Sequence, residues 1–206
     1  MVVIIDYDAG NVKSVLRACE AVGADAVISG DPAAIEGASH VILPGQGAFG
    51  DAMDHIKAQG LITPVLNSIK KGTPFLGICL GLQVLFSDSE ESPGVEGLSV
   101  LSGHVVRITG GKDQAGHKLR IPHIGWSSVT LKGEGRLFSG IEGEPFFYFD
   151  HSYYLRSDDK SIVTAGCDYG VSMDVSVERD NIFACQFHPE KSSDTGLRVL
   201  KNFVGL

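Results

Sequence analysis

The sequence has few cysteines and little positive charge. Its four cysteines never show the Cys-x-x-Cys spacing of zinc sites, and we expect three of them, Cys19, Cys167 and Cys185, to pack in the core. The 17 Lys and Arg are outnumbered by 25 Asp and Glu, so the net charge is −8. No basic stripe offsets this charge, which argues against a general nucleic-acid binder. We therefore expect no metal, no cofactor and no nucleic-acid partner.

The sequence also lacks long apolar runs. No run approaches the length of a membrane-spanning helix, and the N-terminal apolar stretch ends at Asp6, too soon for a secretion signal. Together with the free thiols, these features predict a reducing, cytoplasmic location. The chain has 206 residues, 43% of them hydrophobic and 20% charged. This length and composition are typical of one globular domain with a sizeable core, which we expect to span residues 1–206.

The first half of the sequence alternates between strand-like and helix-like segments. Continuous apolar runs are typical of strands buried on both faces, and apolar residues at helical spacing are typical of helices. Asp31 and Pro32 resemble an N-cap followed by the first residue of a helix. The other expected elements are strands at residues 2–5, 26–28, 41–43 and just before Cys79, and helices at 12–22, 51–56 and 61–71.

The second half contains short strands and turns. The alternation before it predicts an α/β fold with a mainly parallel, partly mixed central sheet flanked by helices. The Gly- and Lys-containing segment 109–119 is a candidate hairpin or lid. The expected strands lie at residues 100–108, 145–149, 162–167, 171–177 and 182–186, and a closing helix lies at 194–203.

A lone cysteine lies on the turn between a short apolar strand and the start of a helix. Gly77 and Gly81 flank Cys79, and they lack the Cβ atoms that would clash where strand and helix meet sharply. This is the layout of a nucleophile elbow with sulfur in place of a hydroxyl. The N-terminal end of the helix favours thiolate over thiol. The alternative is a buried structural cysteine.

A histidine follows a second apolar segment near the C-terminus. A thiolate nucleophile needs an imidazole to manage its proton, and the imidazole needs an acceptor to fix its tautomer. His188 can be the first, and Glu190, two residues on across Pro189, can be the second. A lone histidine at a strand end is also a common structural residue. The combination with the elbow favours a Cys-His-Glu triad.

These segments converge on one place in the expected fold. The reactive crevice of an open α/β sheet lies beyond the carboxyl ends of its strands. The loop at residues 44–47, Cys79 and His188 each follow an expected strand. We therefore expect all three at the same edge of the sheet.

Together, the elbow, the His-Pro-Glu segment and the Pro-Gly-x-Gly loop resemble the triad-type, or class I, glutamine amidotransferases, which implies a flavodoxin-like architecture. Residues 5–15, 122–126 and 148–153 narrow the resemblance to the glutaminase subunits of imidazole glycerol phosphate synthases, enzymes of histidine biosynthesis. The resemblance covers essentially the whole chain. Three residues depart from the family pattern: Asp8 replaces a glycine, Ser127 an asparagine and Asp150 an apolar residue.

The resemblance implies that Cys79 attacks the side-chain amide of glutamine, giving a γ-glutamyl thioester and ammonia, with His188 as general acid and base oriented by Glu190. Backbone N–H groups must then stabilise the tetrahedral oxyanion, and losing one such donor typically costs about 3–4 kcal/mol. The residues implied in oxyanion and substrate binding are Gly45, Gln46, Gly47, Leu80, Gln83, Glu91, His151, Ser152 and Tyr153.

The resemblance also implies a partner. Ammonia released into water would be protonated and would lose its nucleophilicity, so it is expected to pass directly to a cyclase subunit with a (β/α)₈ barrel, in a heterodimer. The implied interface residues are Asn11, Lys13, Arg120, Trp126, Tyr148 and Lys191.

Three alternatives stay open. The chain could be a stand-alone cysteine γ-glutamyl hydrolase that needs no partner. It could serve a different synthase, although its Pro-Gly-Gln-Gly loop at residues 44–47 lacks the Gly-Gly-Glu-Ser signature expected of the relatives that make pyridoxal phosphate. It could also be a binding subunit without chemistry, which the presence of Cys79, His188 and Glu190 disfavours.

Overall fold

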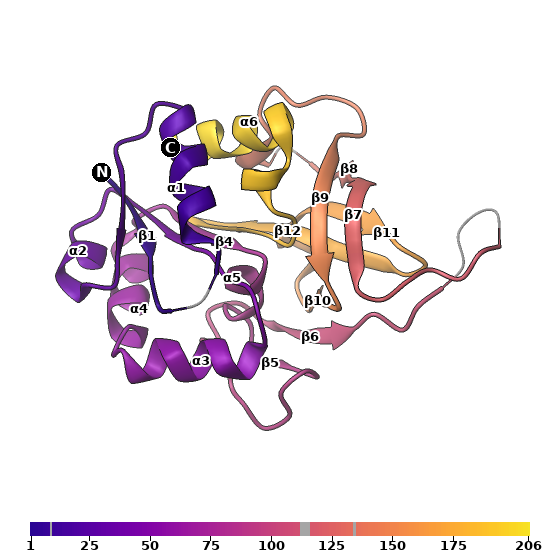
Figure 1. Ribbon diagram of the computed structural model, residues 1–206, viewed down its shortest axis with the longest axis horizontal. Coiled ribbons are helices and arrows are strands. Elements are labelled where there is room, and N and C mark those ends of the chain that lie inside the picture. Colours follow the sequence, from indigo (N-terminus) through magenta and orange to yellow (C-terminus); the bar gives the residue numbers. More distant parts are fainter. Residues whose placement is uncertain (9, 112–115, 134) are drawn as a thin grey trace.

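A parallel sheet flanked by helices forms one half of the molecule (Figure 1). The computed structural model describes residues 1–206 except 9, 112–115 and 134. The parallel strands lie side by side in the order β2-β1-β3-β4-β13. Their bounds are β1 Val2–Ile5, β2 Ala26–Ser29, β3 His40–Leu43, β4 Phe75–Ile78 and β13 Ile182–Cys185.

Antiparallel strands extend this sheet beyond β13. From there the order continues β12-β10-β6-β5, with β11 paired to β12 and β8 paired to β11. The sheet is therefore mixed, as the sequence predicts. The bounds are β5 Asp88–Ser89, β6 Gly103–Arg107, β8 Thr130–Leu131, β10 Tyr153–Ser157, β11 Val163–Asp168 and β12 Ser172–Arg179.

A separate ribbon of two antiparallel strands, β7 (His123–Ser128) and β9 (Phe146–His151), crosses in front of the antiparallel half in Figure 1. The long connection from β6 to β7 projects from the body of the molecule. Leu119 N–H donates to Gly111 O at 2.9 Å, which closes the base of this connection as expected for a hairpin. The tip of the lid candidate, residues 112–115, lies outside the described residues.

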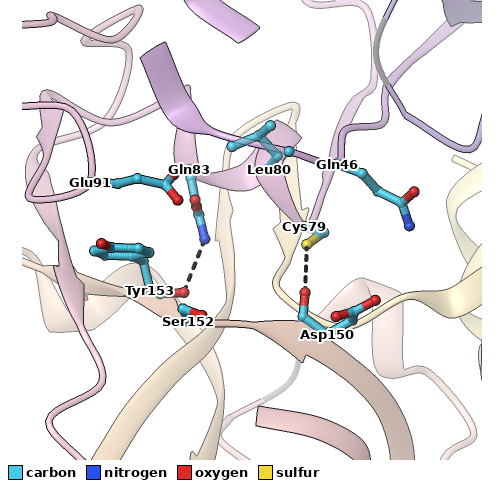
Figure 2. Close-up of a pocket in the computed structure, with 9 residues that line it drawn as sticks. Gln46, Cys79, Leu80, Gln83, Glu91, Asp150, Ser152 and Tyr153 are labelled. Atoms are coloured by element: carbon cyan, nitrogen blue, oxygen red, sulfur yellow. Dashed lines mark hydrogen bonds between the residues drawn. The ribbon is translucent and has the colours of Figure 1, made fainter. Parts of the chain in front are cut away.

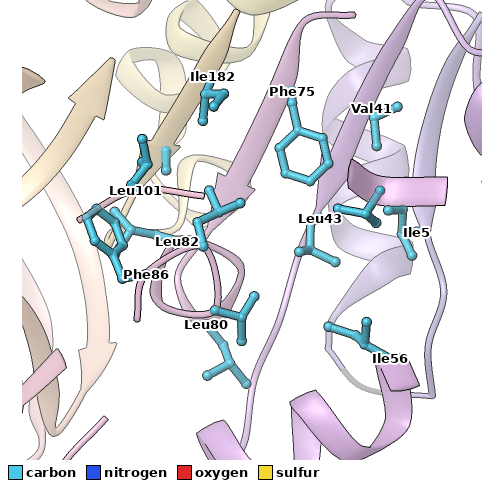
Figure 3. Packing of buried hydrophobic residues seen from close by; sticks show 14 of the residues in the cluster. Ile5, Val41, Leu43, Ile56, Phe75, Leu80, Leu82, Phe86, Leu101 and Ile182 are labelled. Carbon is cyan, nitrogen blue, oxygen red and sulfur yellow. The ribbon is translucent and has the colours of Figure 1, made fainter. Parts of the chain in front are cut away.

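Helices cover both faces of the parallel half, because its strands are apolar on both sides. Val3 and Ile5 of β1 join one hydrophobic cluster, and the alternate residues Val2 and Ile4 join the other. The first cluster lies under α2 to α5, and Figure 3 shows Ile56 of α3 in it. The second lies under α1 and α6. The helix bounds are α1 Val12–Ala21, α2 Pro32–Glu36, α3 Phe49–Ala58, α4 Ile62–Lys71, α5 Leu80–Gln83 and α6 Ser193–Val204, with short 3₁₀ helices η1 Arg136–Phe138, η2 Lys160–Ile162 and η3 Pro189–Lys191.

Most local expectations are confirmed. The expected strands and helices form, with ends displaced by a few residues, and the Asp31 side chain caps α2 by accepting from Ala33 N at 3.1 Å. Cys19, Cys167 and Cys185 are buried free thiols. Strands β5, β7, β8 and β10 were not expected from the sequence. Within the described residues, no helix is long and apolar enough to cross a membrane.

Candidate active site

Cys79 lies on a strained turn between β4 and α5. Its φ of 55° is in the left-handed region that side chains other than glycine rarely adopt. A Cβ on Gly77 would lie 2.5 Å from Gly81 O, and a Cβ on Gly81 would overlap Leu43 O. Both glycines are therefore required by close backbone contact, and the sharp strand–turn–helix geometry expected of an elbow is present.

The carboxyl ends of three neighbouring parallel strands form the site. In the sheet, β4 lies between β3 and β13, with Leu43 beside Gly77 and Ile78 beside Cys185. Cys79 N–H donates to Cys185 O at 2.8 Å, which ties the elbow to the end of β13. The 44–47 loop, Cys79 and His188 thus leave the same edge of the sheet, as predicted.

His188 and Glu190 form a buried pair beside the elbow. Nδ1 of His188 and Oε1 of Glu190 are 2.8 Å apart, and their side chains are 2% and 1% exposed. Burial alone would lower the pKa of His188, but the charge of Cys79 and the hydrogen bond and charge of Glu190 raise it to about 10. The contact with Glu190 uses Nδ1, and the buried Nε2 has no hydrogen-bond partner among the described residues. Cys79, His188 and Glu190 thus lie near one another, as a triad would require.

A cavity of about 230 Å³ opens in front of the cysteine (Figure 2). Of the expected pocket residues, Gly45 and His151 do not line this cavity; Asp150, which was not expected there, does. Gly45 instead packs tightly behind the elbow, where a Cβ would lie 2.8 Å from Leu80 Cβ. The lining residues are Gln46, Gly47, Cys79, Leu80, Gln83, Glu91, Asp150, Ser152 and Tyr153.

Two backbone segments line the cavity together with Cys79. The Leu80 N–H belongs to the first residue of α5 and so has no acceptor within that helix. The other segment carries the exposed Gln46 and Gly47, and Gly47 has a φ of 102° with nothing within 4 Å of a Cβ placed there. The start of this loop is held by Tyr7, whose hydroxyl donates to Pro44 O at 2.9 Å. Gly45 is therefore tightly packed, whereas the backbone at Gly47 has open space around it.

Glu91 lines the cavity, and an unexpected hydrogen bond to the start of α3 holds its side chain there. Its Oε2 accepts from Phe49 N–H, at the start of that helix, at 2.8 Å. This hydrogen bond fixes the Glu91 carboxyl group at one end of the cavity.

Gln186 is a functional candidate that the sequence analysis did not single out. It is fully buried directly after β13, and its Nε2 donates to Cys79 Sγ at 3.6 Å. Its Oε1 accepts from Gln83 Nε2 at 3.1 Å. The sequence did carry a signal for Gln186: an uncharged polar residue at the end of an otherwise apolar strand.

His151 faces the interior and pairs with His123, directly opposite it in the β7–β9 ribbon. His151 Nδ1 donates to Tyr153 O at 2.8 Å, so its Nε2 must accept from His123 Nδ1 at 3.1 Å when both rings are neutral. His123 Nε2 then accepts from Ser127 Oγ at 2.8 Å. The departure at Ser127 therefore supports the buried pair.

This pair makes folding sensitive to acid. Burial, with a smaller contribution from the other ring, lowers the pKa of His123 from 6.5 to about 3, and burial lowers that of His151 to about 4. Below pH 6.5 the unfolded chain binds protons that the folded chain refuses, so stability falls as the pH drops. At pH 5 each histidine costs about 2 kcal/mol relative to pH 7.

We expect His123→Phe to flatten this dependence. The phenyl ring keeps the stacking on Phe149 and Tyr169 but cannot be protonated. The variant is less stable at pH 7, because His151 loses its donor. The difference in unfolding free energy between the two proteins shrinks by about 2 kcal/mol between pH 7 and pH 5 in urea titrations. A difference that is constant with pH contradicts the assignment of a neutral pair.

Three of the expected interface residues come together on the outer face of the ribbon. Trp126 lies opposite Tyr148, their ring centroids are 6.2 Å apart, and Lys191 Nζ is 5.6 Å from the centre of the Tyr148 ring. Trp126 is 51% exposed, and Ile124 and Phe146 extend the same apolar face. We call Ile124, Trp126, Phe146 and Tyr148 the ribbon face.

The other expected interface residues are placed differently. Asn11 and Lys13 lie at the start of α1, which packs against η3 and so reaches the neighbourhood of Lys191. Arg120 precedes β7 on the projecting connection, where its carbonyl accepts from Tyr169 Oη at 3.0 Å.

The contacts of the two other residues that depart from the family pattern, Asp8 and Asp150, are defined. Asp8 has a φ of 63° and accepts from Gln59 Nε2 at 2.7 Å, which ties its loop to the end of α3. Asp150 has an exposed side chain, while its carbonyl lies 4.0 Å from Cys79 Sγ. Among the described residues, no group of three His, Cys, Asp or Glu side chains is arranged to hold a metal ion.

Comparisons with known proteins agree with this geometry. The family model "Glutamine amidotransferase class-I" matches residues 3–205. "Imidazole glycerol phosphate synthase subunit HisH" of Syntrophotalea carbinolica is 46% identical over 203 residues, which are 98% of either chain. Its namesake from Methanothermobacter thermautotrophicus is 48% identical over 204 residues, 99% of this chain and 98% of that relative.

The fold has solved counterparts. The crystal structure of a glutamine amidotransferase superposes with a TM-score of 0.76 at 22% identity and covers 100% of both chains. The sheet, the elbow and the family match define the class as class-I glutamine amidotransferase. The chain belongs to that family and, within it, to the HisH subunits of imidazole glycerol phosphate synthase.

Proposed function

We propose that this chain hydrolyses glutamine to glutamate and ammonia through a thioester on Cys79 and delivers the ammonia to a cyclase subunit. The observation that carries this proposal is the elbow cysteine beside the buried His188–Glu190 pair, at the floor of a cavity that suits an amino acid. Membership among the HisH subunits supports a partner subunit in the synthase, and we propose that this partner is the cyclase. We further propose that residues 1–206 act as one domain, in the cytoplasm, where its four free thiols stay reduced.

The chemistry follows from the positions of the groups. The Cys79 thiolate attacks the side-chain carbonyl carbon of glutamine, and the Leu80 N–H with a donor from the 44–47 loop binds the oxyanion. His188 then gives its proton to the departing nitrogen, so ammonia leaves and the γ-glutamyl thioester remains. Water attacks the thioester with His188 as base, which releases glutamate and regenerates the thiolate. Glu190 keeps the imidazole oriented throughout.

Glutamine is held by the far side of the cavity. Glu91 supplies the negative charge for the α-ammonium group, and Gln83 and the backbone at Ser152 and Tyr153 supply further polar contacts. We expect the 44–47 loop to switch glutamine hydrolysis on and off, because rotation of one peptide there adds or removes an oxyanion donor.

The partner we propose is a (β/α)₈-barrel cyclase that condenses the ammonia with a phosphoribulosyl carboxamide nucleotide. Its docking surface is the ribbon face, with Asn11, Lys13, Arg120 and Lys191 around it. The exposed aromatic residues support this assignment, because Trp and Tyr are favoured anchors of interfaces.

Glutamate release by the chain alone, with the cyclase, and with the cyclase plus its nucleotide ligand tests the proposal. We expect weak release from the isolated chain and a strong increase in the complex. Full activity without the cyclase would favour a stand-alone γ-glutamyl hydrolase, and no activity under any condition would favour a binding subunit without chemistry.

We expect Trp126→Ala to weaken binding of the cyclase by about tenfold or more, because a central aromatic anchor typically contributes more than 1 kcal/mol. Its side chain is 51% exposed, so unfolding in urea should hardly change. Leu66→Ala, at a 37% exposed apolar residue on α4, is the matched control and should leave binding unchanged. Loss of soluble protein in the Trp126 variant alone would identify a core residue instead.

A further inference from the structure

Gln186 contacts the nucleophile from the interior of the protein. It is fully buried, does not line the cavity, and presents Nε2 to Cys79 Sγ at 3.6 Å. We propose that Gln186 is a fourth catalytic residue, whose side-chain amide donates a hydrogen bond to the Cys79 thiolate and holds it ready for attack. This role deepens the proposed function. It rests on that function for the attack of the thiolate on glutamine.

The Gln186 side-chain amide can present only its nitrogen, not its oxygen, to the Cys79 sulfur. Tyr153 O is a carbonyl and can only accept, so the Gln83 side chain must turn its NH₂ group toward it, at 3.0 Å (Figure 2). The same NH₂ group donates to Gln186 Oε1 at 3.1 Å. With its oxygen used there, Gln186 has only N–H hydrogens to offer Cys79. A chain of directed hydrogen bonds thus runs from β10 to the reacting sulfur.

The backbone holds this donor in place. Gln186 N–H donates to Val175 O of β12 at 2.8 Å, and the preceding residue, Cys185, accepts from Cys79 N–H at 2.8 Å. The amide and the sulfur are therefore attached to the same pair of neighbouring strand ends. Such a fixed donor needs no reorganisation when negative charge appears on the sulfur.

The direction of approach leaves the reaction path open. Because Gln186 reaches the sulfur from the protein side, the side of Cys79 that lines the cavity stays free for the substrate carbon. The charge of His188 acts on the same sulfur. A hydrogen bond to a thiolate opposes the cost of burying its charge, and Gln186 is placed to make that bond.

Other titratable groups near Cys79 must be considered. Asp150 lines the cavity with it, Tyr7 and Cys185 interact with it electrostatically, and Glu190 and His151 lie behind His188. The Tyr7 hydroxyl already donates to Pro44 O, the Cys185 thiol to Phe187 O and His151 Nδ1 to Tyr153 O, and a carboxylate has no hydrogen to donate, so none of them replaces a donor lost from position 186.

The test is the pH dependence of alkylation of Cys79 by iodoacetamide in the full chain, followed by mass spectrometry, since only the thiolate reacts. Gln186→Met keeps the length of the side chain and removes its donors. We expect the midpoint of the pH profile to rise by about one unit, as for loss of one hydrogen bond to a charged group. Gln59→Met, at an exposed glutamine on α3's C-terminal end, is the matched control and should leave the midpoint unchanged.

A second variant covers failure of the first to fold. Gln83→Met leaves Gln186 in place but removes the group that fixes its orientation, so the midpoint should rise by a smaller amount. An unchanged midpoint in the folded Gln186→Met protein, or in Gln83→Met if only that variant folds, overturns the role of Gln186.

Kinetics of glutamine hydrolysis in the cyclase complex separate this role from the function itself. Gln186→Met should lower kcat about tenfold with little change in KM, because Gln186 touches the sulfur and not the cavity. A raised alkylation midpoint together with no glutamate release by the unaltered complex would overturn the proposed function and leave the thiolate contact standing. A raised midpoint with a change in KM alone would overturn the catalytic role.

Discussion

Replacing Cys79 with alanine should reduce glutamate release in the complex by about 10⁴-fold or more, the scale seen when a covalent nucleophile is removed. No other group can take its place. Cys185, the neighbouring thiol, is fully buried with a pKa raised by that burial and by the charges of Glu190 and Cys79, so it cannot form the thioester. The measurement is steady-state glutamate release at saturating glutamine.

Synthesis from added ammonium salts should survive in the same complex, because ammonia bypasses the glutaminase step. Cys185→Ala is the matched control and should retain glutamate release, since its thiol donates to Phe187 O at 3.5 Å and does not line the cavity. If Cys79→Ala also stopped synthesis from ammonium salts, Cys79 would be supporting the partner and not acting as a nucleophile.

The triad could be predicted from the sequence because each member carries a local signal. Cys79 stands between two glycines that the elbow requires, and Glu190 lies two residues from His188. The rule that reactive groups lie beyond the carboxyl ends of the strands then places both segments at one edge of the sheet. The sheet edge itself follows from the alternation of apolar runs with helices. Such signals need only short segments and general rules of α/β folds.

The supporting contacts could not be predicted in the same way. Gln186 reaches Cys79 only because β13 lies beside β4, a pairing of segments about a hundred residues apart. The His123–His151 pair likewise depends on the register of β7 and β9. Side-chain pairs of this kind depend on strand register, which the pattern of one strand does not determine.

For a related reason, strand β7 was missed in the sequence analysis. β7 carries Gly125 and two serines, and its apolar residues Ile124 and Trp126 face outward, so it lacks the apolar run of a buried strand. Its partner β9 alternates inward Phe147 and Phe149 with outward residues, and this pattern was found. An exposed apolar face is typical of a docking surface, and there the usual inward–outward pattern fails.

The elbow also sets the largest expected effect on stability. Gly81→Ala should lower the free energy of unfolding by about 4 kcal/mol or more, since the new methyl group would overlap Leu43 O, a carbonyl at the end of β3 that cannot retreat without moving the strand. α5 and β3 would have to separate, and the Leu80 N–H would leave its place beside Cys79. Denaturation in urea measures the loss directly.

A control separates this overlap from the ordinary cost of replacing a glycine. Gly60 has a φ of 70°, and nothing lies within 4 Å of a Cβ placed there, so Gly60→Ala should cost only the ~1–2 kcal/mol of a left-handed backbone. A Gly81→Ala protein no less stable than Gly60→Ala would mean that the elbow yields to a methyl group. The turn at Cys79 would then be easily deformed, and the fixed oxyanion donor proposed at Leu80 would lose its structural basis.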